Sequence, residues 1–472
     1  MGSKPARNWV LALTSIASLM VALDTLVVST ALSTIRLDFG ASIEELEWTV
    51  NAYNLSFAVL LMTAAGLGDR FGRRRLFSAG LGLFVAASTA CALAPDVGSL
   101  IAARAVQGVG AALVMTLALA LVSAAFPPER RGTALGIFFG VTGLAVGSGP
   151  VVGGAIADGL AWEWIFWLNV PIGLLVIPFV LRQIEESFGP DTSLDLPGLA
   201  LVTGGALGIV WGLVRGNSAG WSSLEVVSSL VAGVALAAAF VAWELRAREP
   251  MLPMQFFRSR AFSAGNAAIF CLFASLFTAV FFLAQFLQTA LGYGPLDAGL
   301  RLVPWTATLM VCAPIAGALA DRLGERPFMV GGLLLQVVGM GWIALIAEPG
   351  LSYSEMIPPL IIGGAGVSMA IPAAQNSVVG SVPVEAIGKA AGTNSTMREL
   401  GGVFGIAISV AVFAGAGSYA SAQAFSDGFA PAIGVSAGLA LIGAAAALGL
   451  PGRRRATVQV CPAPAASPGG VQ

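Results

Sequence analysis

Charged residues are scarce in this chain, and histidine is absent. Only 10% of the 472 residues are charged, whereas a soluble globular protein carries about 25%. The sequence therefore predicts an integral membrane protein. Without histidine, metal sites and proton relays built on imidazole are excluded, so any proton carrier has to be a carboxylate. The net charge of −1 identifies no partner, because the charges are segregated between loops.

Cysteine is also too rare and too scattered for a disulfide framework. Of the four cysteines, Cys91, Cys271 and Cys312 lie inside apolar runs, and Cys461 lies near the end of the chain. We interpret those in the apolar runs as small apolar packing residues. We expect neither a metal site nor a cofactor.

Long apolar runs fill most of the chain, and 57% of its residues are hydrophobic. Because a helix of about 20 mostly apolar residues crosses a bilayer, the runs predict about 14 membrane-spanning helices and an all-α integral membrane fold. They begin near Trp9, Trp48, Leu76, Ser99, Ala134, Trp164, Gly198, Leu224, Phe262, Ala298, Phe328, Ile357, Gly388 and Phe429.

The loops between these runs predict the orientation. The first apolar run, residues 9–32, exceeds the roughly 7–15 residues of a signal-peptide core, so we interpret it as an uncleaved helix. An even number of spans places both termini on one side, and nearly all basic residues gather on that side. The opposite side receives only Arg36, Arg215 and Arg301. We therefore expect a multi-pass protein of the cell membrane with both termini in the cytoplasm.

A charge cluster at residues 66–75, GLGDRFGRRR, separates the apolar runs at 48–67 and 76–94. A related segment, GALADRLGER, occupies residues 317–326, which suggests an internal repeat. We expect a six-helix bundle over residues 1–190, two inserted helices over 191–250, a second six-helix bundle over 251–452, and a disordered cytoplasmic tail over 453–472.

The repeated segment resembles the loop signature of the major facilitator superfamily, and the 14 spans resemble its drug:proton antiporter branch. In that family the loop latches the two bundles together on the cytoplasmic side. The residues that match this cytoplasmic gating loop are Leu67, Asp69, Arg70, Gly72, Arg73, Asp321 and Arg322. The alternative is a loop that only determines topology.

Asp24 is the one acid that we place well inside a predicted span. A charge at the bilayer centre costs on the order of 2.5–3.5 kcal/mol on insertion scales, and protonation removes that cost. The surrounding L-D-x-T-x-V pattern resembles the first-helix signature of the antiporter branch, which implies a proton carrier. The alternative is an acid that holds helices together through neighbouring hydroxyl groups.

Arg104 is the matching embedded cation. The segment R-x-x-Q-G-x-G-A, with Gln107 and Gly108, resembles the family's fourth-helix motif, whose arginine is linked to proton coupling. An arginine that approaches and leaves a carboxylate could load and unload a proton. The alternative is a static ion pair or a clamp on backbone carbonyls.

A glycine-rich segment follows in the fifth span. Its glycines at four-residue spacing allow helices to approach closely, and its proline kinks the helix. The G-P-x-x-G-G element resembles the antiporter signature of the superfamily. It comprises Gly149, Pro150, Gly153 and Gly154.

Embedded polar and aromatic side chains are candidates for a substrate cavity, although each could instead join helices through hydrogen bonds. The candidates are Asn51, Tyr53, Asn54, Asn266, Gln285, Gln375, Asn376, Asn394 and Arg398.

Together these features predict proton-coupled efflux of small amphipathic drugs or antibiotics by alternating access. The expected partners are the substrate, protons and the lipid bilayer, with no nucleic acid, and we expect a monomer. Three alternatives remain: a dedicated exporter of one metabolite, antibiotic or lipid; a receptor on a transporter scaffold; and a membrane enzyme, which the lack of catalytic motifs disfavours.

Overall fold

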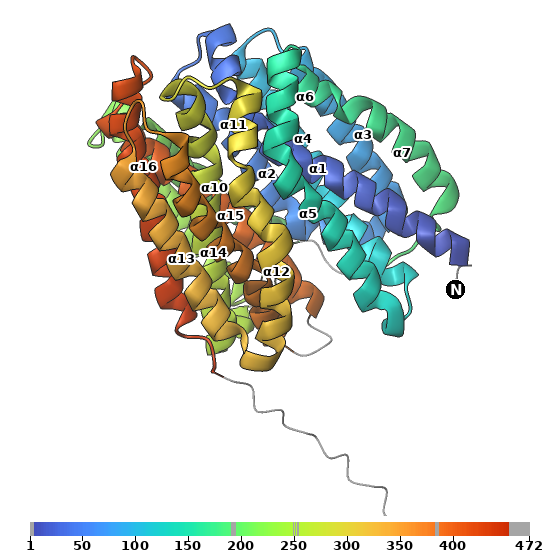
Figure 1. Ribbon diagram of the computed structural model, residues 1–472. Coiled ribbons are helices and arrows are strands. Elements are labelled where there is room, and N and C mark those ends of the chain that lie inside the picture. The colour runs from blue at the N-terminus through green and yellow to red at the C-terminus, as the bar shows by residue number, and fades with distance from the viewer. Residues whose placement is uncertain are drawn as a thin grey trace, which may run out of the picture.

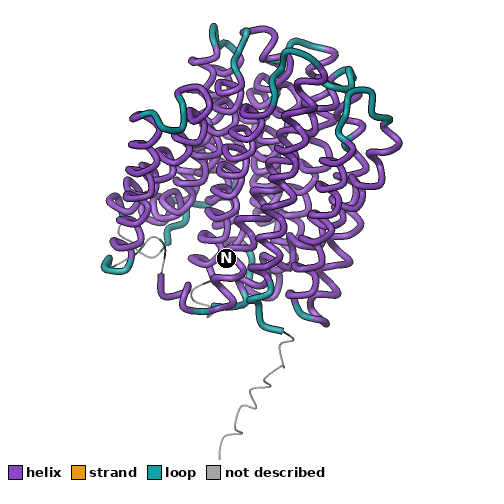
Figure 2. Tube along the Cα trace, turned by 90° about the vertical axis from the view of Figure 1, so that its left-hand side faces the viewer, coloured by secondary structure: helices purple, strands orange, loops and turns teal. Residues whose placement is uncertain are grey.

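The computed structural model describes residues 4–189, 195–248, 250, 252, 254–382 and 387–452, and within this part of the chain every regular element is a helix. The helices run side by side, with loops at their two ends (Figures 1 and 2). The side chains of some helical residues, Asp321 and Arg322 among them, lie outside the described residues.

The first half of the chain forms an N-terminal bundle, drawn in blue to green in Figure 1. Within it, α2 and α3 pack against α4, α1 packs against α5, and α7 packs against α1 and α3. Its helices are α1 (Lys4–Phe39), α2 (Ile43–Phe71), α3 (Arg73–Ala92), α4 (Val97–Ala125), α5 (Pro128–Gly159), α6 (Trp164–Trp167) and α7 (Asn169–Gln183).

The last part of the chain forms a C-terminal bundle, drawn in yellow to red in the same view. Here α13 packs against α14 and α16, while α10 packs against α15 and α16. Its elements are η1 (Met254–Arg258), α10 (Arg260–Thr289), α11 (Pro295–Arg301), α12 (Val303–Leu323), α13 (Glu325–Ile346), α14 (Tyr353–Val379), α15 (Ile387–Ala416) and α16 (Ala422–Ala447).

Two further helices, α8 (Leu196–Ala219) and α9 (Leu224–Glu244), form a hairpin between the bundles in sequence. Glycines let their backbones come close, because a Cβ atom at Gly233 would lie 2.6 Å from the amide nitrogen of Ile209. The other face of α8 packs against both α2 and α15. The hairpin therefore contacts both bundles.

The expected 14 spans agree with these helices. Twelve described helices or helix pairs are long and apolar enough to cross a membrane, and α2, which bends by 54° near its middle, is a thirteenth. The described apolar helices thus number 12 to 13, in rough agreement with the expected 14, and α5 is a further long helix of 32 residues. The pairs α6–α7 and α11–α12 each act as one span.

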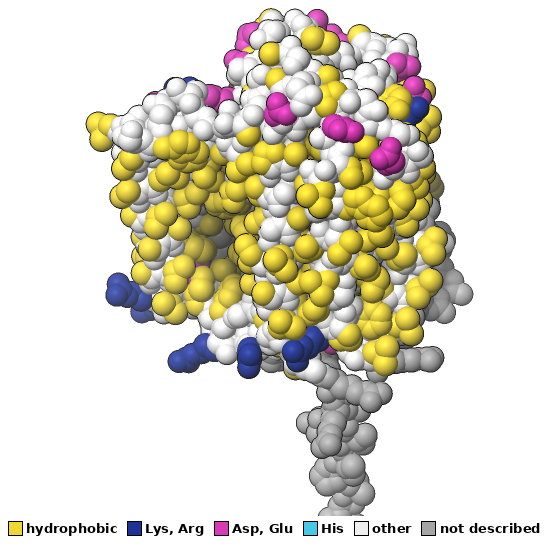
Figure 3. Space-filling model, turned by 60° about the vertical axis from the view of Figure 1, so that its left-hand side comes forward, with side chains coloured by type: hydrophobic (Ala, Val, Ile, Leu, Met, Phe, Trp, Pro, Cys, Tyr) yellow, Lys and Arg dark blue, Asp and Glu magenta, His cyan; other side chains and the backbone are white. Residues whose placement is uncertain are grey.

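The exposed charged side chains lie mostly at the two ends of the helices. On the face in Figure 3, Asp and Glu side chains gather at one end and Lys and Arg side chains at the other, with a broad apolar band between them. The same face is hollowed between its two protruding parts. This distribution is what a protein spanning a bilayer requires.

We predict that Gly233→Val destabilises the α8–α9 hairpin. The added side chain has to displace the backbone of α8, and overpacking of this kind costs about 1–3 kcal/mol. The thermal unfolding midpoint of the purified protein should fall. Gly438→Val in α16 is the matched control, because a Cβ atom there meets nothing within 4 Å; equal midpoints for the two variants would contradict the prediction.

Candidate functional site

Asp24 lies near the middle of α1 and faces the interior of the N-terminal bundle. It is 3% exposed, and its Oδ2 lies 2.6 Å from Nη1 of Arg104 on α4. Its Oδ1 accepts hydrogen bonds from Gln107 Nε2 at 2.9 Å and Asn169 Nδ2 at 2.8 Å. The structure thus brings the two expected coupling residues, Asp24 and Arg104, into direct contact.

Arg104 has further partners besides Asp24. Its Nε donates to the carbonyl oxygen of Thr49 at 3.1 Å, and its Nη1 also donates to Gln107 Oε1 at 2.7 Å. Its guanidinium lies 4.2 Å from the centre of the Tyr53 ring. The hydroxyl of Ser88 on α3 accepts from both Gln107 and Asn169. The ion pair is therefore the centre of a polar network that joins α1, α2, α3, α4 and α7.

Tyr53 and Thr25 connect this network to the central cavity. The Thr25 hydroxyl lies 3.3 Å from the Tyr53 hydroxyl, and Thr25 lines the cavity while Asp24 does not. Because Asp24 and Thr25 are adjacent on α1, they point in different directions. The Asp24 carboxylate therefore lies behind the cavity wall. The Thr25 and Tyr53 hydroxyls and the Tyr53 ring, which contacts Arg104, connect it to the cavity.

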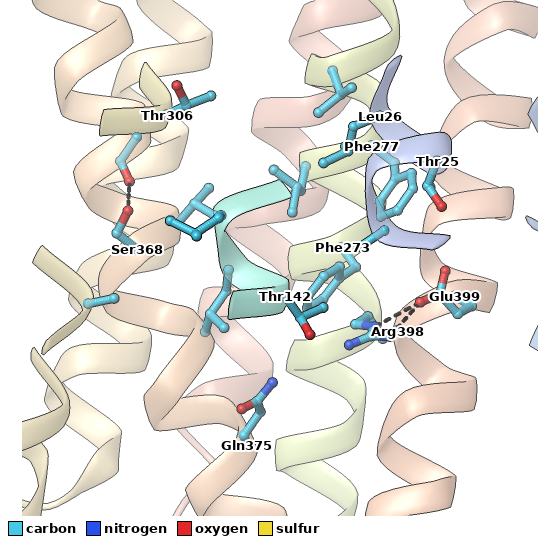
Figure 4. A pocket seen from close by; sticks show the side chains of 18 of the residues that line it. Thr25, Leu26, Thr142, Phe273, Phe277, Thr306, Ser368, Gln375, Arg398 and Glu399 are labelled. Atoms are coloured by element: carbon cyan, nitrogen blue, oxygen red, sulfur yellow. Dashed lines mark hydrogen bonds and ion pairs between the residues drawn. The ribbon is translucent and has the colours of Figure 1, made fainter. Parts of the chain in front are cut away.

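The cavity lies between the two bundles and has a volume of about 760 Å³. Its wall is mostly apolar, with Phe57 from the N-terminal bundle and Phe273, Phe277 and Trp305 from the C-terminal one. Polar groups are few and spaced apart. They include Thr25, Thr142, Thr306, Ser368, Gln375, Arg398 and Glu399 (Figure 4). A large apolar cavity with sparse polar groups suits a small amphipathic ligand.

Glu399 is a second deeply buried acid, and it lies in the cavity wall. It lies in the interior of α15, is 4% exposed, and accepts from Nε and Nη2 of its neighbour Arg398, both at 2.8 Å. Figure 4 shows this pair beside Phe273. The expectation that Asp24 is the one acid well inside a span is wrong, since Glu399 is buried in the interior of α15. Glu399 was not expected inside a span, because it follows Arg398 near the start of an apolar run, and two adjacent charges there are typical of the end of a span.

The nine expected cavity residues fall into two groups. Gln375 and Arg398 line the cavity. The others lie elsewhere in this conformation: Asn51, Tyr53, Asn54, Asn266, Gln285 and Asn394 are buried between helices, and Asn376 is exposed. Asn51 donates to Glu47 one turn earlier on α2 at 3.0 Å, and Asn266 donates to the Phe262 carbonyl oxygen within α10 at 2.9 Å, whereas Gln285 accepts from Tyr419 of a distant segment.

Contacts between the bundles close one end of the cavity. Gln288 on α10 donates to the carbonyl oxygen of Thr30 on α1 at 3.0 Å. The guanidinium of Arg36 lies 4.3 Å from the ring centre of Tyr419. Both contacts lie beyond the cavity, toward the end where α1 terminates.

The glycine motif of α5 takes part in the same closure. Gly149 and Gly153 face α1 so closely that a Cβ atom would collide with Leu26 or Val27. Gly154 lies directly against Pro295 of α11, and Gly299 of α11 lies against the carbonyl of Pro150. The missing side chains therefore permit contact within the N-terminal bundle and across to the C-terminal one.

Comparison with known proteins identifies the family. The sequence pattern of the Major Facilitator Superfamily matches residues 14–406 and 266–465. The chain belongs to this superfamily.

Relatives and solved structures agree with this assignment. The tetracenomycin C resistance and export protein of Streptomyces glaucescens is 33% identical over 84% of this chain and 73% of its own. The multidrug resistance protein Stp of Mycobacterium tuberculosis is 34% identical, with 85% and 75% covered. A puromycin resistance protein of Streptomyces alboniger is 34% identical, with 88% and 83% covered. In structure, a D-xylose-proton symporter matches with a TM-score of 0.67 at 16% identity over 94% of this chain and 98% of its own, which shows the shared fold.

The family's loop signature forms a local network within the N-terminal bundle. Asp69 Oδ1 accepts from Arg73 Nε at 2.8 Å, and Gly72 adopts φ 105° between α2 and α3. Leu67 is half-buried, and Arg70 is exposed. The matching side chains of Asp321 and Arg322 lie outside the described residues. Among the described residues, Asp69 makes no hydrogen bond or ion pair with the C-terminal bundle.

The sequence alone did not reveal two partners of these motifs. Glu186, after α7, accepts from the backbone N–H groups of Arg74 at 2.8 Å and Arg75 at 3.2 Å, and so caps the start of α3. Asn169, 145 residues further along the chain, donates a hydrogen bond to the Asp24 carboxylate. In the sequence, the acidic loop after α7 could have indicated Glu186, and the polar Asn169 within an apolar run could have indicated a buried hydrogen bond.

Gly108 lets α4 approach α2, because a Cβ atom there would collide with Ser56 and with the carbonyl of Tyr53. This close approach places Arg104, one turn earlier on α4, within reach of the Thr49 carbonyl. The helix 4 motif therefore combines the cation, its amide partner and the glycine that lets the two helices meet.

We predict that Arg104→Gln strongly destabilises the protein, because it leaves the Asp24 carboxylate buried without its cation. Removing one partner of a buried ion pair costs about 3–5 kcal/mol. The double variant Asp24→Asn with Arg104→Gln should recover much of the loss in thermal unfolding midpoint. Arg215→Gln is the control, since that arginine pairs with Glu44 and Glu225 in a partly exposed position, where such pairs contribute about 0–1 kcal/mol. A single variant as stable as the wild type would contradict the prediction.

Proposed function

We propose that this protein is a secondary active transporter that exports small amphipathic compounds in exchange for protons. The observation that carries the proposal is the pair of buried carboxylates at one cavity: Glu399 in its wall and Asp24 directly behind it. Relatives named for antibiotic export, multidrug resistance and puromycin resistance support the direction of transport and the substrate class.

The surroundings of Asp24 accommodate both of its protonation states. When Asp24 is ionised, Arg104 neutralises it. When Asp24 is protonated, Arg104 keeps the Thr49 carbonyl, Gln107 Oε1 and the Tyr53 ring as partners. Neutral Asp24 can still accept from Gln107 and Asn169. A site that leaves no buried charge without a partner in either state is suited to gain and lose a proton during each cycle.

Glu399 is the group at which the proton and the substrate meet. It borders the cavity, and Arg398 neutralises its ionised form. A bound substrate that donates a hydrogen bond or carries a positive charge interacts best with the ionised carboxylate. Protonation of Glu399 weakens that interaction, so the proton and the substrate exclude one another. Mutual exclusion at one site is what exchange requires.

Rocking of the two bundles about this site exposes it to each side in turn. In the conformation described here, the contacts of Thr30, Arg36, Gln288 and Tyr419 close one end. We assign that end to the outside, because the basic residues gather at the opposite end; both termini then lie in the cytoplasm. The proposed unit is a monomer with its own substrate path.

The loop of Asp69 and Arg73 serves as the latch of the opposite conformation. Here Asp69 bonds only within its own bundle among the described contacts, as expected when the cytoplasmic end is open. Closure of that end would bring the loop toward the second signature copy, with Asp321 and Arg322.

We predict that Glu399→Gln abolishes substrate-driven proton movement because glutamine cannot release a proton. Purified protein is placed in liposomes with a pH-sensitive dye inside and an imposed pH gradient, and lipophilic dyes and antibiotics are added one at a time. The wild type should move protons when a substrate is added, and Glu399→Gln should fall to the level of protein-free liposomes. Asp24→Asn should also lose the coupled movement.

Exchange of labelled for unlabelled substrate without a gradient is the control for folding. It should persist in Glu399→Gln, since the cavity remains and the bundles still rock. Glu355→Gln, at an exposed site in the first turn of α14 and outside the cavity wall, should behave like the wild type. Coupled proton movement that survives in both carboxylate variants would contradict the proposed carriers, and a wild type that moves substrate without protons would contradict antiport.

A further inference from the structure

A second cavity lies outside the transport path, between α2, α4 and the inserted helix α8. It has a volume of about 730 Å³. The wall is apolar except for the hydroxyls of Ser56 and Thr203 and the indoles of Trp48 and Trp211. The Ser56 hydroxyl is already bonded to the carbonyl oxygen of Ala105 at 2.8 Å. The lining residues are Trp48, Ala52, Leu55, Ser56, Val59, Leu60, Ile101, Ala102, Ala105, Leu199, Thr203, Leu207 and Trp211.

The groove opens toward the surrounding bilayer, since Ala102, Leu207 and Trp211 at its margin are exposed. It is long and narrow. Helix α8 lines it from Leu199 to Trp211, and α2 lines it over the same number of residues in the opposite direction. At 1.5 Å per residue this distance is about 18 Å, close to the roughly 15 Å of one hydrocarbon leaflet.

One end of the groove carries the features of a membrane interface. The rings of Trp48 and Trp211 lie 5.9 Å apart there, and tryptophan is enriched at the level of lipid headgroups. Trp211 Nε1 donates to Glu225 Oε1 at 3.1 Å. Arg215 contacts Glu225 at 3.2 Å and Glu44 at 3.3 Å. Two carboxylates surround one guanidinium, so this rim has a net negative charge.

We propose that the groove binds one phospholipid whose headgroup carries an ammonium group, as phosphatidylethanolamine does. One acyl chain lies along the groove between α8 and α2, and the ammonium group meets Glu44 and Glu225 at the rim. An empty apolar groove would leave its wall without contacts, whereas an acyl chain supplies them along its whole length. The negative rim favours an ammonium over a headgroup that carries only a phosphate charge.

This lipid gives the inserted hairpin a role. Helix α8 contacts α15 of the C-terminal bundle through Val210 and Val214 among others, while the lipid fills the space between α8 and the N-terminal bundle. The α8–α9 hairpin can then remain packed against α15 while the bundles rock, because a flexible acyl chain fills part of the space between α8 and the N-terminal bundle.

The test measures bound lipid directly and does not depend on transport. Protein is reconstituted in vesicles with equal amounts of phosphatidylethanolamine, phosphatidylglycerol and phosphatidylcholine bearing the same acyl chains. It is then extracted in mild detergent and analysed by native mass spectrometry. We expect one retained phospholipid per chain, with phosphatidylethanolamine enriched over its share of the vesicle.

Variants locate the site. Thr203→Trp fills the middle of the groove and should lose the retained lipid. Val234→Trp is the control, since it adds the same ring to an exposed position on α9 outside the groove. Glu44→Gln with Glu225→Gln should keep one lipid but lose the preference for phosphatidylethanolamine. Equal retention by Thr203→Trp and Val234→Trp, or enrichment of phosphatidylglycerol, would overturn the proposal.

A second measurement uses the unblocked groove. Phosphatidylethanolamine with brominated acyl chains quenches nearby tryptophan fluorescence. Quenching of the wild type at low mole fractions should exceed that of Trp211→Phe, because Trp211 lines the groove. Identical quenching curves for the two proteins would contradict a lipid at this site even if Thr203→Trp fails to fold.

Discussion

The ion pair between Asp24 and Arg104 is the centre of a polar network that joins five helices of the N-terminal bundle. A charge buried in hydrocarbon requires partners, and here each ion has the other together with several hydrogen-bonding groups. This requirement fixes how α1 and α4 face each other, and it explains why Gly108 has no side chain where α4 meets α2. The cavity wall formed by α1 follows from the same arrangement, because Thr25 faces the cavity once Asp24 faces inward.

The contacts between the bundles are of a different kind. They rest on backbone approach at Gly154 and Gly299, on one hydrogen bond and one cation–ring contact at one end, and on apolar packing of α2 against α15. No carboxylate–guanidinium pair between the bundles occurs among the described residues. Contacts of this kind can form and break without separating an ion pair, which is what the proposed rocking of the bundles requires.

Much of the fold could be predicted from the sequence because a bilayer admits few structures. The scarcity of charge predicted a membrane protein, and apolar runs of the right length predicted about 14 spans, with which the 12 to 13 apolar helices among the described residues roughly agree. Motif patterns also predicted Asp24, Arg104, Gln107 and Gly108, since an embedded ion is rarely placed without a role.

The sequence by itself therefore determined the class of fold, the approximate number of spans and the two embedded charges, Asp24 and Arg104, because insertion into hydrocarbon limits each residue separately. Only the tertiary structure decided which polar groups meet. It placed Glu399 in the cavity wall and Asp24 behind that wall, and it placed Asn51, Asn266 and Gln285 outside the cavity wall, buried in the protein. Periodicity along a helix shows that a side chain is embedded, but which neighbour it faces depends on how helices far apart in sequence pack and turn about their axes.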